Sequence, residues 1–401
     1  MQHQDVVLVE ALRTPIGRLG GKLAAVRPDD LLATVFAAVV ERSGIEPTKI
    51  DQVYAGAANQ SGEDNRNVAR MATLLAGLPD SLPGVTVNRL CASGLEAVVQ
   101  AYRQIALGEA NCVLAGGVES MSRAPYVLGK AQKAYPVGGL QAQDTTLGWR
   151  FKNPKLEAIF PLEAMGCTAE NLVDDYDLSR SDQDAYALNS QNKALAAIDA
   201  GQFAREIVPV EVHYRKHSET VAEDEGPRRG SSLESLAKLR PAFRSGGSVT
   251  AGNSSTLNDG AAALLVCSRA FAHEHDLPIR ACIRSVASSG VDPTRMGIGP
   301  VPASRLALKR AGLTTDDLDL IELNEAFAAQ SLACLRALEL DPAKVNIRGG
   351  AIALGHPLGC SGARILTTLL HAMEDHNSHL GLATLCVGVG QGLAMIIERP
   401  I

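Results

Sequence analysis

The chain has 401 residues, 46% of them hydrophobic and 20% charged, and its net charge of −6 is spread along the sequence without a basic block. This composition excludes nucleic acid as an expected partner, and no apolar run reaches the roughly 18 residues of a membrane-spanning helix. The eight cysteines lack metal-ligand spacing and the first residues lack a secretory leader, so we expect no metal site, reduced thiols and a cytoplasmic location.

The first part of the chain alternates apolar, β-rich stretches with helical ones, which is typical of α/β layers. Helices are predicted at residues 30–44, 67–78 and 95–108, and the first should end at Gly44. Strands are predicted at residues 5–11, 50–58, 84–90 and 112–120.

The alternation of predicted strands and helices is interrupted from about residue 121 to 248. This segment holds the only tryptophan and several charged runs, and it predicts an inserted loop domain with helices of its own, such as residues 179–198. Residues 249–268 then resume the strand-to-helix pattern.

A second half of the chain repeats the first. The segment CASGLEAVVQAYRQI, followed by CVLAGGVESM, has a counterpart in GCSGARILTTLLHAM, followed by LATLCVGVGQGLAMII. Each begins a helix with Ser-Gly, so Ser93 and Gly94 correspond to Ser361 and Gly362. The repeat predicts two related halves. Their expected bounds are residues 1–270, with the insertion, and 275–401.

Cys91 lies in NRLCASG, between a predicted strand and a predicted helix. A free cysteine is most often a buried packing residue. A helix N-terminus, however, stabilises negative charge and lowers the pKa of a thiol from about 8.5 towards neutrality. The small residues that follow leave room for a carbonyl to approach backbone N–H groups, as an acyl-transfer nucleophile requires. This motif alone leaves both interpretations open.

Three other elements carry groups that could do chemistry. His356 lies between a glycine and a proline that together orient it, although it could be an ordinary turn histidine. Cys386 lies at the end of a predicted strand in LCVGVGQG, where a core cysteine is the alternative. In IELNEAFAAQSLACL, Asn324 and Glu325 are predicted in the first turn of a helix, where such polar residues are common.

The motifs RTPIG, NRLCASG, VTAGNSS, NEAFA, GGAIALGHPLGCSGAR and CVGVGQG occur in the order and spacing of the thiolase family, which the sequence resembles from end to end. The resemblance implies a five-layer αβαβα fold of two duplicated α/β halves with mixed sheets, with the inserted loop domain over the active-site entrance. It also implies an acyltransferase that cleaves or forms 3-oxoacyl-CoA thioesters by Claisen chemistry through an acyl-cysteine intermediate. Coenzyme A and acetyl-CoA would be substrates, and no cofactor would be bound permanently.

The resemblance assigns a role to each catalytic candidate. Cys91 would be the nucleophile, and His356 would take up its proton and help bind the thioester oxygen. Asn324 would hold a water in that first oxyanion hole. Cys386 would be the general acid and base at the acetyl α-carbon. The backbone N–H groups of Cys91 and Gly388 would form the second oxyanion hole.

A coenzyme A surface is implied in the same way. An arginine against the adenine and a serine near the pantetheine are physically reasonable partners, whereas a solvated charged loop is the alternative for GPRRG. The matching residues are Arg228, Ser235, Ala242, Phe243, Ala251, Ser255, Met296 and Phe327.

Two stretches, SGEDNRNVARMATLLAGLP and AQDTTLGWRFKNP, resemble the 3-oxoadipyl-CoA thiolases of aromatic catabolism in the β-ketoadipate pathway. This predicts cleavage of 3-oxoadipyl-CoA to succinyl-CoA and acetyl-CoA. Candidates to bind the substrate's carboxylate are Arg66, Arg150, Thr145 and Thr146. NIR and AMGCTAEN depart from those relatives, so an acetyl-CoA acetyltransferase and a broad-chain 3-ketoacyl-CoA thiolase of fatty acid metabolism remain alternatives.

Two more distant classes are disfavoured. A ketoacyl synthase would carry histidine in place of Cys386, and a non-catalytic acyl-CoA-binding protein would lack Cys91, His356 or Cys386. Acyl-CoA substrates are the expected partners, and the resemblance alone predicts a homodimer or homotetramer.

Overall fold

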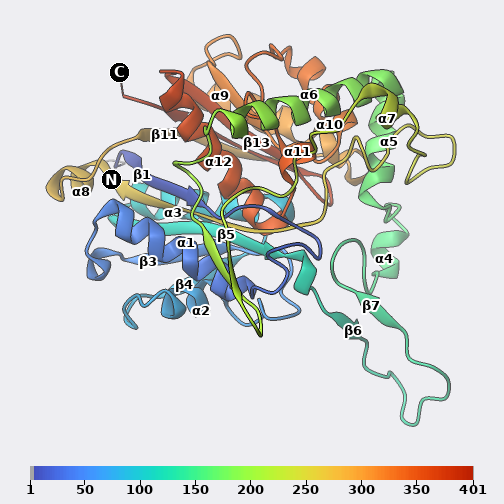
Figure 1. Cartoon of the computed structure of the whole chain (residues 1–401), viewed down its shortest axis with the longest axis horizontal. Coiled ribbons are helices and arrows are strands. Elements are labelled where there is room, and N and C mark those ends of the chain that lie inside the picture. Colours follow the sequence, from blue (N-terminus) through green and yellow to red (C-terminus); the bar gives the residue numbers. More distant parts are fainter. Residues whose placement is uncertain (1–3, 401) are drawn as a thin grey trace.

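Two groups of strands dominate the computed structural model, which describes residues 4–400 (Figure 1). The strands of the first half are β1 (Val6–Arg13), β2 (Gly17–Arg18), β3 (Gln52–Gly56), β4 (Gly84–Val87), β5 (Cys112–Ser120) and β10 (Asn258–Ser268). Those of the second half are β11 (Ala281–Gly290), β12 (Leu320–Leu323), β13 (Leu380–Val387) and β14 (Gln391–Glu398).

Both groups form mixed sheets, as predicted. In the first, β4, β3 and β5 are parallel, and β5, β10 and β1 are antiparallel. In the second, β12 and β13 are parallel, and β13, β14 and β11 are antiparallel. The edge strands β1 and β11 pair over two positions only, Val7 with Cys282 and Leu8 with Ala281, which joins the groups into one 10-stranded order.

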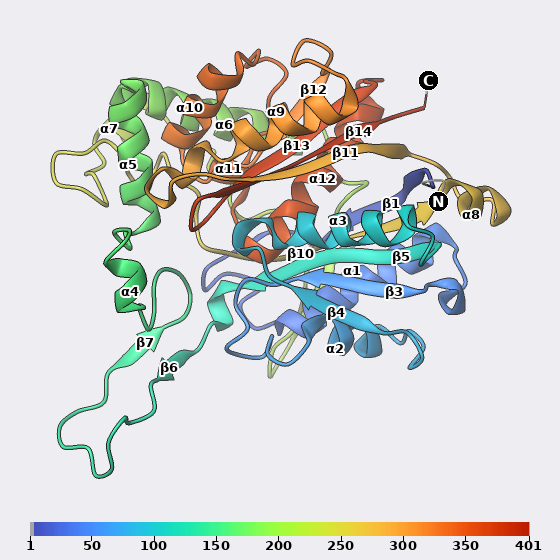
Figure 2. The same ribbon diagram turned by 180° about the vertical axis from the view of Figure 1, so that it is seen from behind.

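Helices cover both faces of each group and confirm the five-layer αβαβα fold. Figure 2 shows the central layer between the two groups of strands. This layer consists of α3 (Ser93–Ala106) and α12 (Leu358–Asp375), which pack on each other; α3 packs on the first group and α12 on both groups. The outer layers hold α1 (Pro28–Ser43) and α2 (Val68–Leu75) on one side and α9 (Pro300–Ala311) and α10 (Ala328–Leu338) on the other. Three hydrophobic cores fill the spaces between these layers.

Local sequence accounts for these elements. Helix α1 ends before Gly44, which adopts the left-handed conformation with φ of +71°, as predicted from the glycine. All nine residues of β5 are buried, because helices cover both faces of its sheet. Shorter elements are α8 (Arg269–Glu274), α11 (Ala351–Leu354), η1 (Pro47–Lys49), η2 (Leu90–Ala92), η3 (Met121–Arg123) and η4 (Pro293–Ile298).

The repeat seen in the sequence corresponds to the crossing of α3 and α12. A Cβ added at Gly94 would lie 2.7 Å from the carbonyl oxygen of Gly359 on α12. Reciprocally, a Cβ added at Gly362 would lie 2.4 Å from the backbone nitrogen of Leu95 on α3. The two matched glycines therefore let the backbones of the two central helices approach each other closely.

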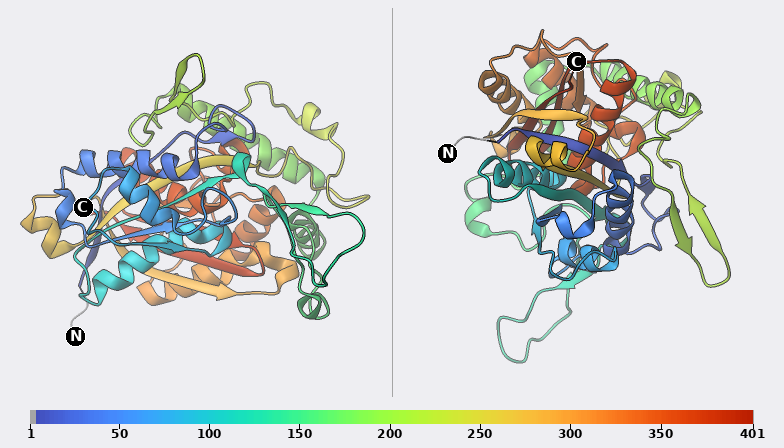
Figure 3. Two further views of the ribbon diagram at one scale, coloured as in Figure 1. Left: turned by 90° about the horizontal axis from the view of Figure 1, so that it is seen from below. Right: turned by 90° about the vertical axis from the view of Figure 1, so that its left-hand side faces the viewer.

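The predicted insertion forms helices and two hairpins that project from the body (Figure 3). Its predicted helix is confirmed as α6, which Ser179 caps by accepting the Asp182 N–H at 3.0 Å. Buried Arg13 of β1 anchors the segment to the body by ion pairs with Glu206 at 2.6 Å and Asp224 at 2.7 Å. The insertion's elements are β6 (Tyr126–Leu128), β7 (Ala142–Asp144), α4 (Pro154–Glu157), α5 (Met165–Tyr176), α6 (Arg180–Asp199), β8 (Val210–His213), β9 (Ser218–Val221) and α7 (Leu233–Ala237).

Helices within residues 4–400 are all too short or too polar to cross a bilayer.

Candidate active site

Cys91 lies in the single-turn helix η2, between β4 and α3. The preceding Leu90 has φ of +46°, in the left-handed region that residues other than glycine seldom adopt. The Ser93 hydroxyl stabilises this turn by accepting the Arg89 N–H at 2.9 Å and donating to the Leu90 carbonyl at 2.7 Å. Backbone strain of this kind is found where surrounding structure holds a functional turn.

The expectation of a lowered Cys91 pKa is wrong. Desolvation raises the pKa of the thiol to about 11, and the nearby carboxyl of Glu119 contributes to the rise. Hydrogen bonds from the backbone N–H groups of Gly388 and of Cys91 itself oppose it. The residue is half-buried against the core between the sheets, so the lost hydration of a thiolate outweighs the effect of the helix N-terminus. At neutral pH the thiol keeps its proton.

Three contacts position His356 before α12. Gly355 has φ of +114°, and a Cβ there would lie 2.4 Å from the Asn258 side chain. Asn258 Oδ1 accepts the His356 backbone N–H at 3.0 Å. The His356 Nδ1 lies 2.6 Å from the Oγ of Ser361, whose proton is donated to the Pro357 carbonyl at 2.8 Å. Nδ1 therefore donates its proton to Ser361, and Nε2 keeps the lone pair that can accept one.

The imidazole is neutral at physiological pH. Burial, together with the positive charge of Arg364, lowers the pKa of His356 to about 3. Arg364 is itself buried and pairs with Glu322 at 3.2 Å. A neutral, oriented imidazole can accept a proton from a thiol during a reaction and donate it back.

Asn324 faces His356 from the other side of the site. Its predicted place in the first turn of a helix, with Glu325, is wrong, because β12 runs to Leu323 and α10 begins only at Ala328. The Asn324 Nδ2 lies 3.4 Å from both ring nitrogens of His356. Its Oδ1 is buried and has no hydrogen-bond partner within residues 4–400. A buried carbonyl oxygen of this kind is suited to bind a water or a ligand.

Cys386 lies near the end of β13 and is 1% exposed. Burial raises the pKa of its thiol well above the ordinary value, and charge on Cys91 and Cys334 contributes. The loop after the strand turns over the nucleophile, since a Cβ at Gly388 would lie 3.1 Å from Leu90 Cδ1. The structure therefore places two thiols with raised pKa values side by side.

These candidates meet at one place. The η2 turn packs against both α12, which follows His356, and β13, which carries Cys386. The N–H groups of Cys91 and Gly388 both lie close enough to the Cys91 sulfur to lower the pKa of its thiol. The arrangement offers a nucleophilic thiol, two nearby N–H donors, a neutral imidazole and a second thiol. Such a set can carry out acyl transfer with proton movement at a neighbouring carbon.

Sequence reasoning missed Asn258, Ser361 and Glu119. Glu119 is 2% exposed, and its carboxylate accepts N–H groups from Ala58 at 3.0 Å and Gly359 at 2.8 Å. Burial raises its pKa to about 7. It ties the loop after β3 to the start of α12, immediately after the histidine. The sequence feature that could have indicated Glu119 is its carboxylate, the one such group in a predicted strand whose other residues are apolar, small or hydroxylic.

The coenzyme A candidates fall into an inner and an outer set. Inside, the rings of Phe243 and Phe327 pack edge to face at 6.0 Å. Met296 and Phe327 share a hydrophobic cluster with Cys386, and the Ser255 N–H donates to the carbonyl before Phe327 at 3.0 Å. These four residues therefore lie close together, beside the second thiol.

The outer set lies on exposed loops. Arg228, Ser235, Ala242 and Ala251 are all exposed, and the helix of Ser235 packs on Gly252, beside Ala251. Among the described residues Arg228 forms no ion pair, whereas the adjacent Arg229 pairs with Asp199. A free guanidinium at the rim can bind a nucleotide.

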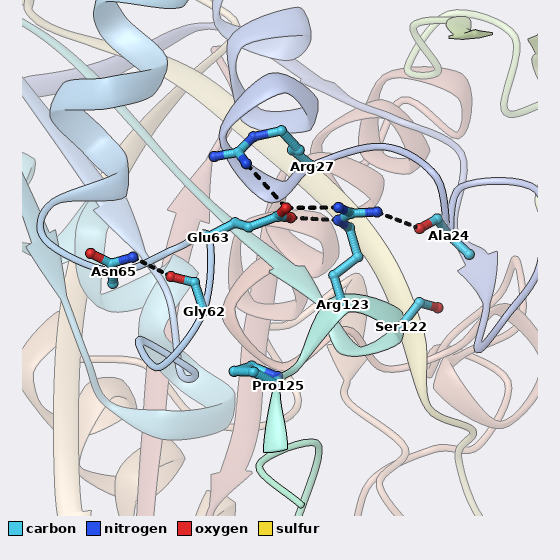
Figure 4. Close-up of a pocket in the computed structure, with 8 residues that line it drawn as sticks. All are labelled: Ala24, Arg27, Gly62, Glu63, Asn65, Ser122, Arg123 and Pro125. Atoms are coloured by element: carbon cyan, nitrogen blue, oxygen red, sulfur yellow. Dashed lines mark hydrogen bonds and ion pairs between the residues drawn. The ribbon is translucent and has the colours of Figure 1, made fainter. Parts of the chain in front are cut away.

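Another hollow lies outside this site (Figure 4). It is open, has a volume of about 480 Å³, and is lined by residues that follow β2, β3 and β5. Glu63 lies between Arg27, at 3.0 Å, and Arg123, at 2.7 Å, so its charges are already paired. None of the catalytic candidates lines it. Residues 4–400 contain no cluster of three or more side chains suited to a metal, and all eight cysteines are free thiols.

Comparisons with known proteins agree with this geometry. Residues 6–270 match the family model described as "Thiolase, N-terminal domain", and residues 277–399 match "Thiolase, C-terminal domain". The chain is 56% identical to a beta-ketoadipyl-CoA thiolase of Pseudomonas aeruginosa, over 99% of both chains. It is 50% identical to the 3-oxoadipyl-CoA/3-oxo-5,6-dehydrosuberyl-CoA thiolase of Escherichia coli, over 99% of this chain and 100% of that protein. The crystal structure of the Bacillus anthracis acetyl-CoA acetyltransferase, 42% identical, superposes over 100% of both chains with a TM-score of 0.95.

Proposed function

The chain belongs to the thiolase family, and from this we propose that it cleaves 3-oxoadipyl-CoA with coenzyme A to give succinyl-CoA and acetyl-CoA, and catalyses the reverse condensation. The proposed substrate rests on the two similar thiolases, whose names specify beta-ketoadipyl-CoA and 3-oxoadipyl-CoA. The enzyme is an acyltransferase that acts on acyl-CoA.

In the first step, the Cys91 sulfur attacks the C3 carbonyl while His356 Nε2 accepts the thiol proton. Because the thiol pKa is about 11 and the imidazole pKa about 3, this transfer requires the bound substrate to stabilise the charges that develop. The C2–C3 bond breaks, and Cys386 protonates the departing acetyl-CoA enolate. The products are an acyl-cysteine and acetyl-CoA.

In the second step, coenzyme A enters and its thiol gives a proton to the Cys386 thiolate. The coenzyme A sulfur attacks the acyl-cysteine, and the acyl group leaves as succinyl-CoA. Cys91 regains its proton from His356. The N–H groups of Cys91 and Gly388 would stabilise the oxyanion of the acyl-cysteine, and Asn324 with His356 would bind the thioester oxygen of the acetyl unit.

One observation carries this proposal: the loop after β13 brings the backbone N–H of Gly388 next to the Cys91 sulfur, beside a second buried thiol, that of Cys386. The packing of Phe243 on Phe327, and of Phe327 in one cluster with Cys386, supports an approach route for the pantetheine arm.

The substrate is tested by initial thiolysis rates on 3-oxoadipyl-CoA, acetoacetyl-CoA and a medium-chain 3-oxoacyl-CoA. We expect the highest kcat/KM on 3-oxoadipyl-CoA, and Cys91→Ala should abolish all three rates while leaving coenzyme A binding. A preference for acetoacetyl-CoA would instead favour an acetyl-CoA acetyltransferase, the activity named for the similar Bacillus anthracis protein.

Three further expectations remain proposals. We propose the domain division at residues 1–270 and 275–401, which the two family-model matches support. A homodimer or homotetramer rests on family membership, and a light-scattering mass near that of one chain at micromolar concentration would contradict it. A cytoplasmic location rests on the sequence alone.

A further inference from the structure

A substrate that ends in a carboxylate needs a partner for that charge close to the nucleophile. A succinyl group on Cys91 extends its carboxylate only about 6 Å from the sulfur, from ordinary bond lengths. The partner must therefore come from the loops next to η2. Burying a carboxylate there without a cation or several donors would cost more than the rest of the acyl chain could repay.

Three hydrogen bonds connect the nucleophile loop to Arg150. Asn88, three residues before Cys91, donates its Nδ2 to the Ala58 carbonyl at 3.1 Å. The next residue, Asn59, donates its Nδ2 to the Thr145 carbonyl at 3.1 Å. The same carbonyl accepts Arg150 Nη1 at 3.4 Å. Arg150 is thus held next to the loop after β3, which is bonded in turn to the segment between β4 and Cys91.

Trp149, the residue before Arg150, connects this segment to the other side of the site, where the loop of Gly388 lies. The Trp149 ring lines an apolar crevice with Met165 and Val389. Val389 directly follows Gly388, and a Cβ at Gly388 would lie 3.7 Å from Met165 Sδ. The segment from Thr145 to Arg150 therefore spans from residues bonded to the nucleophile loop to residues packed beside the loop of Gly388.

The other three carboxylate candidates are less suited. The Thr145 hydroxyl is buried and already donates to the Pro125 carbonyl at 2.6 Å. The Thr146 hydroxyl is bonded to Asp144 at 2.6 Å. Arg66 also has free donors within residues 4–400, but its side chain is exposed, and water weakens the attraction of an exposed charge for a carboxylate.

The neighbouring cations are also occupied. Arg89 pairs with Glu96 at 2.8 Å, and Arg123 pairs with Glu63. Arg150 is half-buried, and its only bond within the described residues is the long one to a carbonyl, so most of its donors remain available. A guanidinium with spare donors matches the two oxygens of a carboxylate.

We propose that Arg150 binds the distal carboxylate of the acyl chain and so selects dicarboxylic 3-oxoacyl-CoA substrates over simple fatty acyl chains. This inference rests on the proposed function and names the residue that determines its specificity. Arg150 takes no part in bond making or proton transfer.

The test compares 3-oxoadipyl-CoA with 3-oxohexanoyl-CoA, a chain of equal length that ends in a methyl group. Arg150→Ala should lower kcat/KM on 3-oxoadipyl-CoA by about 10- to 100-fold, the range for one lost charged hydrogen-bond pair, mainly through KM. Its rate on 3-oxohexanoyl-CoA should stay unchanged. Arg150→Lys keeps the charge but not the two-pronged geometry of the guanidinium. Its kcat/KM on 3-oxoadipyl-CoA should lie between those of wild type and Arg150→Ala.

Lys152→Ala is the matched control, because it removes an exposed positive charge two residues away whose one ion pair within residues 4–400 is with Glu157. It should leave both rates unchanged. An Arg150→Ala enzyme that loses activity equally on both substrates, or keeps its preference for 3-oxoadipyl-CoA, overturns the role of Arg150 alone. A wild-type enzyme with no preference between the two substrates overturns the proposed substrate as well.

Discussion

The Nδ1 of His356 lies 2.6 Å from the Oγ of Ser361, one turn along the same segment. Because the Ser361 proton is donated to the Pro357 carbonyl, this contact selects the imidazole tautomer whose Nε2 can accept a proton. Ser361→Ala should therefore slow acetyl transfer from acetyl-CoA to Cys91 by about 3- to 10-fold, the range for one neutral hydrogen bond. Mass spectrometry of the acetylated protein measures the rate.

The matched control is Ser285→Ala. Ser285 is also buried and bonds a backbone carbonyl, that of Ala307 at 2.8 Å, but it lies on β11. It should leave the acetylation rate unchanged. An equal loss in both variants would assign the effect to general destabilisation and not to the tautomer.

Alkylation of Cys91 reports its pKa. With a pKa of about 11, the thiolate fraction increases tenfold per pH unit over the accessible range. The rate of iodoacetamide modification of Cys91 should thus increase steeply between pH 7 and 9, and acetyl-CoA should protect it. Half-buried Cys282, which lies on β11, should be unprotected. A modification rate that reaches a plateau near pH 7 would instead support the lowered Cys91 pKa predicted from the sequence.

Protonation of His356 should couple stability to pH. The folded-state pKa of about 3 lies below the ordinary 6.5, so the folded protein resists a proton that the unfolded chain accepts. Its contribution to stability is full above pH 6.5 and is lost as the pH falls towards 3, with a slope of up to about 1.4 kcal/mol per pH unit. His356→Gln removes this slope.

The measurement is the difference in unfolding free energy between wild type and His356→Gln, from pH 7.5 down to pH 4. We expect wild type to lose stability relative to the variant as the pH falls. His376→Gln, at an exposed position, should run parallel to wild type. A wild-type curve parallel to that of His356→Gln would show that this imidazole is not held neutral by burial.

The crossing of the central helices leaves no room for a methyl group at Gly94. Because its Cβ would lie 2.7 Å from a backbone carbonyl oxygen of α12, Gly94→Ala should destabilise the protein by about 1–3 kcal/mol, the range for overpacking a core. Gly139→Ala, in the projecting hairpin where a Cβ meets nothing within 4 Å, is the control. Chemical unfolding should give a lower midpoint for Gly94→Ala than for Gly139→Ala. Equal midpoints would contradict the close approach of α3 and α12.

Much of the fold was readable from the sequence. Buried strands such as β5 appear as continuous apolar runs, and Gly44 marks the end of α1. The start of α10 was misplaced because the polar pair at Asn324 resembles a helix start, whereas strand β12 runs up to it and tertiary contacts decide the boundary. Hydrophobic periodicity does not predict where such a loop begins and ends.

The site was readable only in part. Glycine-flanked motifs indicate Cys91, His356 and Cys386, because their neighbours must allow close approach of a substrate. Asn258 and Glu119 act through contacts between segments that are far apart in the chain, which local pattern cannot predict. The pKa of Cys91 was predicted with the wrong sign, because a helix N-terminus is visible in the sequence and desolvation is not.

The central claim is that two thiols divide the work: Cys91 carries the acyl group and Cys386 moves the α-proton. Cys386→Ala, followed by mass spectrometry of Cys91 and by NMR of acetyl-CoA recovered from deuterated water, reads both events in one sample. Cys334→Ala, a buried cysteine near Cys386, is the control. We expect Cys386→Ala to retain acetyl transfer onto Cys91 while α-proton exchange falls by about 100-fold or more, a typical general-base contribution. Normal α-proton exchange in Cys386→Ala would contradict the division of labour.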